Sequence, residues 1–336
     1  MMKKLFMFGM AASLLLAGCS NDETVSVAPQ KAIGFSDAFV DNGVRSIEDP
    51  SVTTGTISAF DVYGFTKNGQ IFDGTKVSKV TENDAVKWTY SPLQFWVVGN
   101  TYTFAGIAPS GQTVNSEALS TDGTKIHMTV PFTNDGVTDL LHAAPASVEV
   151  TETFLTSIQP VKMTFGHQLS KVKFSFANGM GTGYNVKVTD IKITNAYTTG
   201  TLNIGETGSW SDQTTNTLTL EFGHAVAPSA IANTVGVIAS GSEYESYYEK
   251  LMIPAPSTAT YTVTFTAELL QGTVTMGTWN HTATIRNTEL KLGYCYDFKV
   301  TLTPSNIDPD HQLQPIEFTV DSVTDWNTME QDKTLM

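Results

Sequence analysis

SKVKFSF, residues Ser170 to Phe176, is the stretch that most clearly indicates the fold. Its apolar and polar side chains alternate: Val172, Phe174 and Phe176 against Lys171, Lys173 and Ser175. Successive side chains of a β-strand point to opposite faces, so the three apolar residues share one face. The pattern predicts a half-buried strand that lays this face on a core.

Segments of the same kind recur along the chain, separated by turn signals such as Asn68-Gly69, Asp73-Gly74 and Gly99-Asn100. The other predicted strands are 33–40, 57–66, 85–90, 101–108, 125–130, 139–143, 184–196, 217–222, 250–254, 260–270, 273–285, 294–303 and 316–326, and the stretch from Pro160 holds a further one. Many short strands at such spacing predict an all-β sandwich or barrel. Residues 225–242 are expected to form a short helix or a loop.

Composition supports an extracellular β protein. Only 15% of the 336 residues are charged, and the formal net charge is -14. Removing a signal segment with Lys3 and Lys4 changes this charge to -16, that is 17 basic minus 33 acidic residues. So acidic a chain is a poor partner for nucleic acid. Once Cys19 is acylated, Cys295 is left without a second cysteine for an intrachain disulfide.

The N-terminus predicts export and lipidation. Two lysines precede an apolar run that ends in Leu16-Ala17-Gly18-Cys19, which is typical of a bacterial lipobox. Cleavage would remove residues 1–18 and leave Cys19 as the lipidated first residue, anchored by several acyl chains. The acidic residues after Ser20 resemble the surface-export signal of Bacteroidetes lipoproteins, and they also fit a solvated tether. We therefore expect a chain on the outer membrane, at the cell surface.

The mature chain is long enough for two domains. Residues 19–32 are predicted to be a flexible tether, because they are polar and lack apolar periodicity. The least patterned stretch of the remainder runs from Pro145 to Gln159. We expect an N-terminal β-sandwich domain over residues 33–158 and a C-terminal one over residues 159–336.

Several segments together resemble the fimbrillin family, the FimA-like and Mfa-like lipoproteins of Bacteroidales. They are the lipobox, the leading Ile33-Gly34-Phe35 with an arginine after it, KWTYSPLQFWVVGNTYTFAGIAP (87–109), DLLHA (139–143), MTFGHQLSKVKF (163–174) and VTDWN (323–327). The resemblance covers nearly the whole chain. It implies two tandem transthyretin-like β-sandwich domains and a role in a pilus, or fimbrium, that acts in adhesion.

The resemblance also implies a maturation step. In fimbrillins an arginine-specific protease cuts after the first strand, which leaves, and a strand of a neighbouring subunit refills the groove. The matching cut lies between Arg45 and Ser46, and the displaced strand carries Ile33, Phe35 and Phe39. The chain has one other arginine, Arg286, which lies in a predicted strand, so a nearly single-site cut is expected.

The C-terminus departs from the family pattern, in which this segment usually donates the strand. Residues 327–336 are polar and do not alternate. Ile316, Phe318 and Val320 alternate well and are the candidate donor segment, after which the parity shifts at Ser322 and predicts a bulge. Either this segment swings out to donate, or the protein is a tip or accessory subunit that only accepts a strand.

The main alternative function is glycan capture at the cell surface. It is suggested by the aromatic residues Trp88, Tyr90, Phe95, Trp96, Tyr102 and Phe104. Exposed, coplanar rings would favour a glycan platform, and buried rings favour a core and therefore the pilus function. Host glycans or proteins remain possible adhesion partners.

No catalytic residues, cofactor or metal site are predicted, because no catalytic or ligand motif occurs. His167 is expected to be a packed or hydrogen-bonded core residue, and Cys295 a structural thiol. Asp308, Asp310 and His311 are expected to form a solvated turn rather than a calcium site. Residues 179–183, rich in glycine, are expected to form a hairpin turn.

Overall fold

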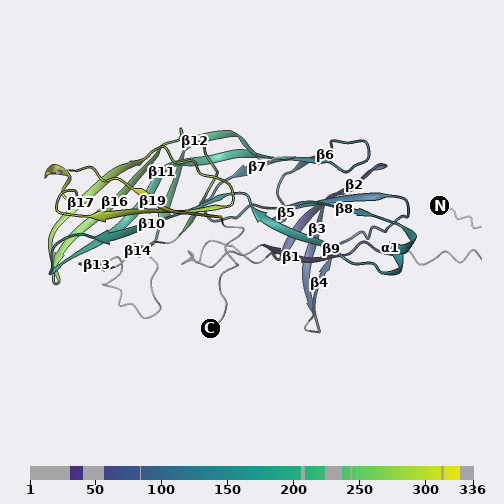
Figure 1. The fold of residues 1–336 in the computed structure, drawn as a ribbon, viewed down its shortest axis with the longest axis horizontal. Helices are drawn as coiled ribbons and strands as arrows, with labels where there is room; N and C mark the ends of the chain where they lie inside the picture. The colour runs from purple at the N-terminus through teal and green to yellow at the C-terminus, as the bar shows by residue number, and fades with distance from the viewer. Residues whose placement is uncertain are drawn as a thin grey trace, which may run out of the picture.

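The computed structural model describes residues 31–40, 57–83, 85–205, 209–223, 237–242, 244–247, 249–311 and 314–325. In these ranges nearly all regular structure is β-strand, which confirms the all-β prediction. The described part of the chain has no helix long and apolar enough to span a bilayer. Figure 1 shows an elongated molecule, with the first strands at one end and β16 and β17 at the other.

A seven-stranded sheet forms the first end, in the order β1-β9-β8-β5-β2-β3-β4. Its strands are β1 (Phe35–Val40), β2 (Ala59–Thr66), β3 (Gly69–Glu82), β4 (Ala85–Thr89), β5 (Thr101–Ala108), β8 (Leu141–Glu149) and β9 (Val161–His167). The short helix α1 (Glu152–Thr156) connects β8 to β9. Its N-cap is Thr151, whose hydroxyl accepts a hydrogen bond from the Phe154 amide.

Two further sheets form the other end. One has five strands: β14 (Glu245–Ser246), β10 (Ser170–Asn178), β18 (Tyr294–Leu302) and β19 (Thr319–Asp325) in that order, with β15 (Lys250–Met252) also paired to β10. The other has the order β17 (Val274–Ile285), β16 (Tyr261–Gln271), β11 (Tyr184–Ile204), β7 (Ile126–Thr133) and β6 (Asn115–Ala118), and β12 (Ser209–Phe222) and β13 (Val237–Ala239) also pair with β11. A 3-10 turn, η2, spans Pro309–His311.

Three apolar clusters hold these sheets together. The largest packs β10 and β18 against β11 and β16, with Phe174 and Phe298 on one side and Ile193 and Val263 on the other. A second cluster lies on one face of the first sheet. A third covers the opposite face of that sheet, where side chains of β2 and β5 meet those of β7 and β11. Strands β2 and β5 are therefore buried on both faces.

Strand pairing crosses the position at which we place the domain boundary. β6 and β7 precede residue 159 and pair with each other, but β7 also pairs with β11, which follows it. β9 follows residue 159 but pairs with β8 and with β1. The division at 158/159 and the transthyretin-like layout of two sandwiches stay predictions.

The structure corrects two expectations about β10 and the segment after it. β10 is not half-buried, because its polar face is buried as well: Lys171 and Ser175 are 2% and 0% exposed. Residues 179–183 do not form a hairpin turn, because β10 and β11 lie in different sheets. The segment instead crosses from one sheet to the other over the buried Met180.

Two predicted turns or loops are strand instead. Asp73-Gly74 lies inside β3, at a bulge where the register to β2 shifts between Val62 and Gly64. Gly74 has a φ of +65°, a conformation that glycine adopts without strain, so the dipeptide bends the strand rather than ending it. The predicted helix or loop over 225–242 contains the strand β13, which pairs with β11.

Candidate functional site

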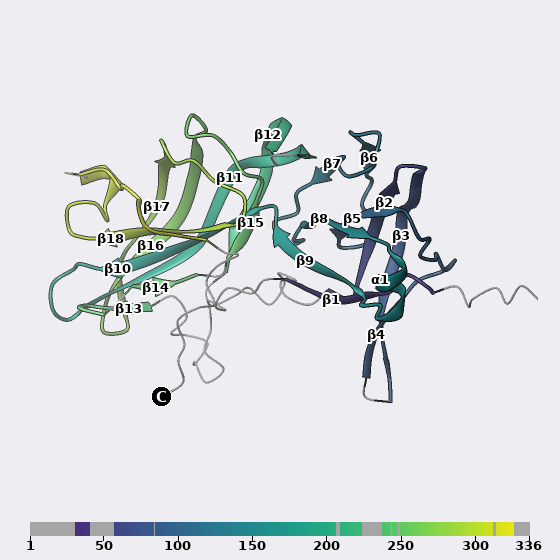
Figure 2. The same cartoon turned by 45° about the vertical axis from the view of Figure 1, so that its right-hand side comes forward.

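β1 is an edge strand of the first sheet. It runs parallel to β9, with Phe35 opposite Val161 and Val40 opposite Phe165. A bulge interrupts this ladder between Ser36 and Phe39. Figure 2 shows β1 lying along β9, with the β3–β4 hairpin projecting beyond it. Among the described strands β1 pairs with β9 alone, so it can leave without parting any other pair.

The side chains of this segment fill the core although the strand is at an edge. Ile33 and Phe35 are 1% and 5% exposed. The ring of Phe35 makes edge contacts at 5.7 to 6.1 Å between centroids with four others: Phe60, Phe72, Tyr90 and Phe104. Such contacts add to the apolar burial of each ring. Removing this segment would therefore open the centre of an aromatic cluster.

The loop after β4 also holds the residues just before β1. The Ile33 amide donates a hydrogen bond of 2.8 Å to the Gln94 carbonyl, and the Trp96 amide donates one of 2.9 Å to the Lys31 carbonyl. The Tyr90 hydroxyl donates to the Ile33 carbonyl at 2.7 Å and accepts from the Gln94 amide at 3.2 Å. Burial raises the pKa of Tyr90, so this hydroxyl stays protonated and can donate. We call Tyr90, Gln94 and Trp96 the Tyr90 latch.

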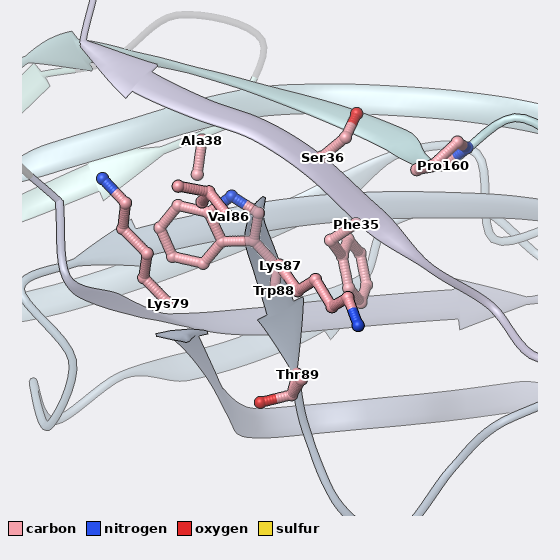
Figure 3. A pocket seen from close by; sticks show the side chains of 9 residues that line it. All are labelled: Phe35, Ser36, Ala38, Lys79, Val86, Lys87, Trp88, Thr89 and Pro160. Carbon is pink, nitrogen blue, oxygen red and sulfur yellow. The ribbon is translucent and has the colours of Figure 1, made fainter. Parts of the chain in front are cut away.

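A pocket of about 540 Å³ lies between β1 and β4. β1 contributes Phe35, Ser36 and Ala38, β3 contributes Lys79, and β4 contributes Val86, Lys87, Trp88 and Thr89, with Pro160 at the end of the lining. Figure 3 shows Trp88, Val86 and Lys79 gathered near Ala38. One wall of the pocket thus belongs to the strand that is predicted to leave.

The candidate donor segment is also packed at a sheet edge. Ile316 is 9% exposed, and the Phe318 ring lies 5.2 Å from Phe174 and 6.3 Å from Phe265 between centroids. The antiparallel ladder between β18 and β19 shifts between Val320 and Ser322. This shift confirms the predicted bulge. The segment is part of its own five-stranded sheet and would have to leave it in order to donate.

Several predicted site residues lie outside the described residues: Cys19, Arg45 and Ser46. Phe39 belongs to β1, but its side chain is not described. The prediction that Arg286 lies in a strand is wrong. β17 ends at Ile285, and Arg286 lies exposed in the loop that follows. Burial in a strand therefore does not protect Arg286 from a protease.

Five of the six aromatic residues that suggest glycan capture belong to the second apolar cluster or pack against it, and the sixth, Phe95, is half-buried. Trp96, Tyr102 and Phe104 are 4%, 2% and 0% exposed. Trp88 is half-buried, and its ring lies 5.4 Å from that of Phe60 at a tilt of 56°. This arrangement is the buried one that favours the pilus function over a flat sugar platform.

Two predicted roles for polar residues fit the structure. His167 is the last residue of β9, and its Nδ1 lies 2.6 Å from the Asp139 Oδ2. Both side chains are 1% exposed. It is a hydrogen-bonded core residue, as predicted. In the turn around η2, the Asp310 amide donates to the Asp308 carboxylate at 3.0 Å. The described residues contain no group of three or more histidine, cysteine or acidic side chains placed to hold a metal ion.

Cys295 lies in β18 and packs, half-buried, against the third apolar cluster. It stands opposite Lys171 in the ladder between β10 and β18. The ammonium of Lys171 lies 3.1 Å from the Glu249 carboxylate, and both side chains are almost fully buried. Buried ions are tolerated when paired in this way, which explains how the polar face of β10 can be covered.

Sequence reasoning missed the Tyr90 latch. The aromatic group that contains Tyr90 and Trp96 was recognised, but nothing local distinguishes a tyrosine that packs from one that bonds a backbone carbonyl 57 positions away. The signal that exists is weak. A Ser-Pro step follows Tyr90 and indicates a turn, and a turn can bring a hydroxyl back to its own loop.

A sequence model of the family described as fimbrillin-like matches residues 48–326. This chain belongs to the fimbrillin-like family. The fimbrillin-like match begins two residues after Ser46 and ends at Trp326, beyond β19. No curated protein matches the chain.

Solved structures of low sequence identity are similar to this fimbrillin-like chain. A fimbrial protein from Bacteroides vulgatus is 15% identical, with a TM-score of 0.48 over 88% of this chain and 99% of that one. A candidate cell adhesion protein from Bacteroides uniformis is 15% identical, with a TM-score of 0.47 over 89% of this chain and 98% of that one.

Proposed function

We propose that this fimbrillin-like chain is a structural subunit of a cell-surface pilus that acts in adhesion, without enzymatic activity. Cys19 carries the lipid anchor that holds the precursor on the outer membrane. An arginine-specific protease cuts between Arg45 and Ser46, and β1 then leaves with Ile33 and Phe35. A strand from another subunit refills the groove.

The observation that carries the proposal is the position of Ile33 and Phe35, which are core residues although they lie just before and at the start of an edge strand, β1. Each fully buried apolar side chain of this size stabilises a fold by about 1.5 to 3 kcal/mol, so the two together contribute about 3 to 6 kcal/mol. A whole domain is stable by about 5 to 15 kcal/mol. The emptied groove would also expose the backbone edge of β9. Both effects strongly favour capture of a replacement strand.

The C-terminal segment of another copy fits the vacated site at two positions. Ile316-Glu317-Phe318 repeats the spacing of Ile33-Gly34-Phe35, with a branched apolar residue two positions before a phenylalanine. In each segment the phenylalanine packs among other aromatic rings. We propose this segment as the donor.

The test uses the full chain in detergent with Arg286→Lys, which leaves Arg45 as the sole arginine. After treatment with an arginine-specific protease, we expect a new N-terminus at Ser46 and, on an unboiled denaturing gel, a ladder that collapses on boiling. Arg45→Lys in the same background is the matched control and should give neither result. A cut at Arg45 followed by persistent monomers would contradict self-assembly and assign this chain to an accepting tip or accessory role.

A further inference from the structure

β1 and β4 are the two outermost strands of the first sheet, yet the sheet curls so that their Cα atoms approach within 8 Å. At one end the two edges are joined by the backbone hydrogen bonds between Lys31–Ile33 and Gln94–Trp96. At the other end, among the described residues, no backbone pair joins β1 to β4. The pocket of about 540 Å³ opens there.

The two ends of the β1 segment are held unequally. The start of the segment is held on both sides. The Gly34 carbonyl accepts a hydrogen bond of 2.8 Å from the Val161 amide, and the neighbouring Ile33 is bonded on the other side by the Tyr90 latch. Beyond Ser36 a bulge interrupts the ladder to β9, which resumes at Phe39, and the other edge of β1 faces the pocket. The portion of β1 nearer to Arg45 is therefore the easier one to displace.

The pocket walls suit an apolar side chain. Val86 is 54% exposed there, and the half-buried indole of Trp88 forms the neighbouring wall. Across from them β1 presents Ala38, a small residue that leaves room (Figure 3). Val86 and Trp88 thus leave a small apolar surface beside β1 against which one side chain could pack.

The charge of the pocket complements the candidate donor. Lys79 and Lys87 line it in a chain whose net charge is -14. Lys87 is paired with Glu82 at 2.9 Å, but both side chains are more than half exposed, so this pair is weak and exchangeable. Residues 316–325 contain Glu317, Asp321 and Asp325 and no lysine or arginine.

We propose that this pocket is where the C-terminal segment of a second copy first docks. The inference rests on the proposed function and adds a direction to it. An apolar side chain of the incoming segment packs against Trp88 and Ala38 while the Tyr90 latch still holds Ile33. Exchange then runs along β9 towards the latch, and Ile33 is released last.

The experiment uses the full Arg286→Lys chain in detergent, cut at Arg45 and diluted so that chains do not meet each other. A fluorescein-labelled peptide of residues 314–325 is added, and its association rate is followed by anisotropy. Release of the fragment that ends at Arg45 is followed separately by chromatography.

Two variants test the docking point. Lys79→Glu with Lys87→Glu should slow association about tenfold at low salt, and less at high salt, because steering by charge is screened. Val86→Trp should fill the pocket and slow association at any salt concentration. The matched control is Lys76→Glu, an exposed lysine on the opposite face of β3, and should leave the rate unchanged.

A third variant tests the direction. Tyr90→Phe should accelerate release of the N-terminal fragment and leave peptide association unchanged, because the latch opens after docking. Association unaffected by both pocket variants would overturn the docking point. Association accelerated by Tyr90→Phe would show that the latch end opens first and would overturn the direction. A peptide that fails to bind even the unaltered cut chain would instead refute the proposed donor, and the inference with it.

Discussion

The Tyr90 hydroxyl donates a 2.7 Å hydrogen bond to the Ile33 carbonyl and thereby joins the loop after one edge strand to the segment before the other. The bond matters because β1 and β4 are opposite ends of one sheet. It closes the sheet at one end only. The segment proposed to leave is thus held by the β9 ladder along its length and by the Tyr90 latch at its start.

Removing the Tyr90 hydroxyl tests how much this bond stabilises the fold. Tyr90→Phe keeps the ring contacts with Phe35 and Phe72 and should lower the free energy of unfolding by about 1 kcal/mol, the usual net value of one hydrogen bond. Urea denaturation measures the change. Tyr244→Phe is the control, because Tyr244 is 42% exposed and its hydroxyl meets the Thr301 hydroxyl at the surface, at 3.1 Å, so the loss should be within about 0.5 kcal/mol. Equal effects in both variants would argue against a latch.

Truncating Phe35 should be far more costly. Phe35→Ala empties the centre of the aromatic cluster and is expected to lower the free energy of unfolding by about 3 to 5 kcal/mol. Phe35→Leu keeps most of the volume and should cost about 1 to 2 kcal/mol. Both are measured on the uncut chain by urea denaturation. A Phe35→Ala loss below about 1 kcal/mol would show that β1 contributes little to this core.

Arg286 should be a second site of cleavage in the native chain. It is exposed in the loop after β17, and such loops are preferred sites of proteolytic nicking. An arginine-specific protease is expected to cut the unaltered chain after residue 286, as identified by N-terminal sequencing of the fragments. Arg286→Lys should abolish this cut and leave any cut at Arg45. Resistance of Arg286 over hours in the native chain would mean that its loop is protected.

His142 should make stability depend on pH. Burial lowers its pKa from 6.5 to about 4, and its Nε2 has no hydrogen-bond partner among the described residues. Between pH 6.5 and about pH 4, His142 is therefore protonated in the unfolded chain and neutral in the folded chain. This contribution to stability is complete above pH 6.5 and is lost as the pH falls from 6.5 to about 4, by an amount on the order of 3 kcal/mol.

The measurement is urea denaturation at pH 7.5, 5.5 and 4.5. His142→Gln should flatten the pH dependence relative to the unaltered chain. An unchanged slope in His142→Gln would place the titrating group elsewhere.

Much of the fold could be predicted because alternation is a local property. The strand expected over residues 101–108 is β5 with the same bounds, and Ile33 and Phe35 are buried as their pattern indicates. β6, by contrast, has the sequence NSEA and no period of its own. It is a strand because β7 pairs with it, and the sequence of these four residues does not indicate this contact.

The candidate site, like the fold, could be predicted from the sequence only in part. The sequence supplied the order of its parts, with an apolar strand, then an arginine, and at the far end a second Ile-x-Phe segment. It could not supply the Tyr90 latch, since that depends on a hydroxyl meeting a carbonyl 57 positions away. Nor could it show that Arg286 is exposed in the loop after β17.

The sequence by itself determined the strand class and the apolar faces, because both follow from side chains at fixed spacing along the chain. It also showed the family, through segments that resemble fimbrillins and through the match to the family model. Tertiary structure alone decided which strands are neighbours. It set β1 parallel to β9 at an edge, curled the sheet until β1 met β4, and buried Lys171 against Glu249. These features arise from contacts between residues far apart in the chain, and the free energy of such contacts depends on the whole packed arrangement.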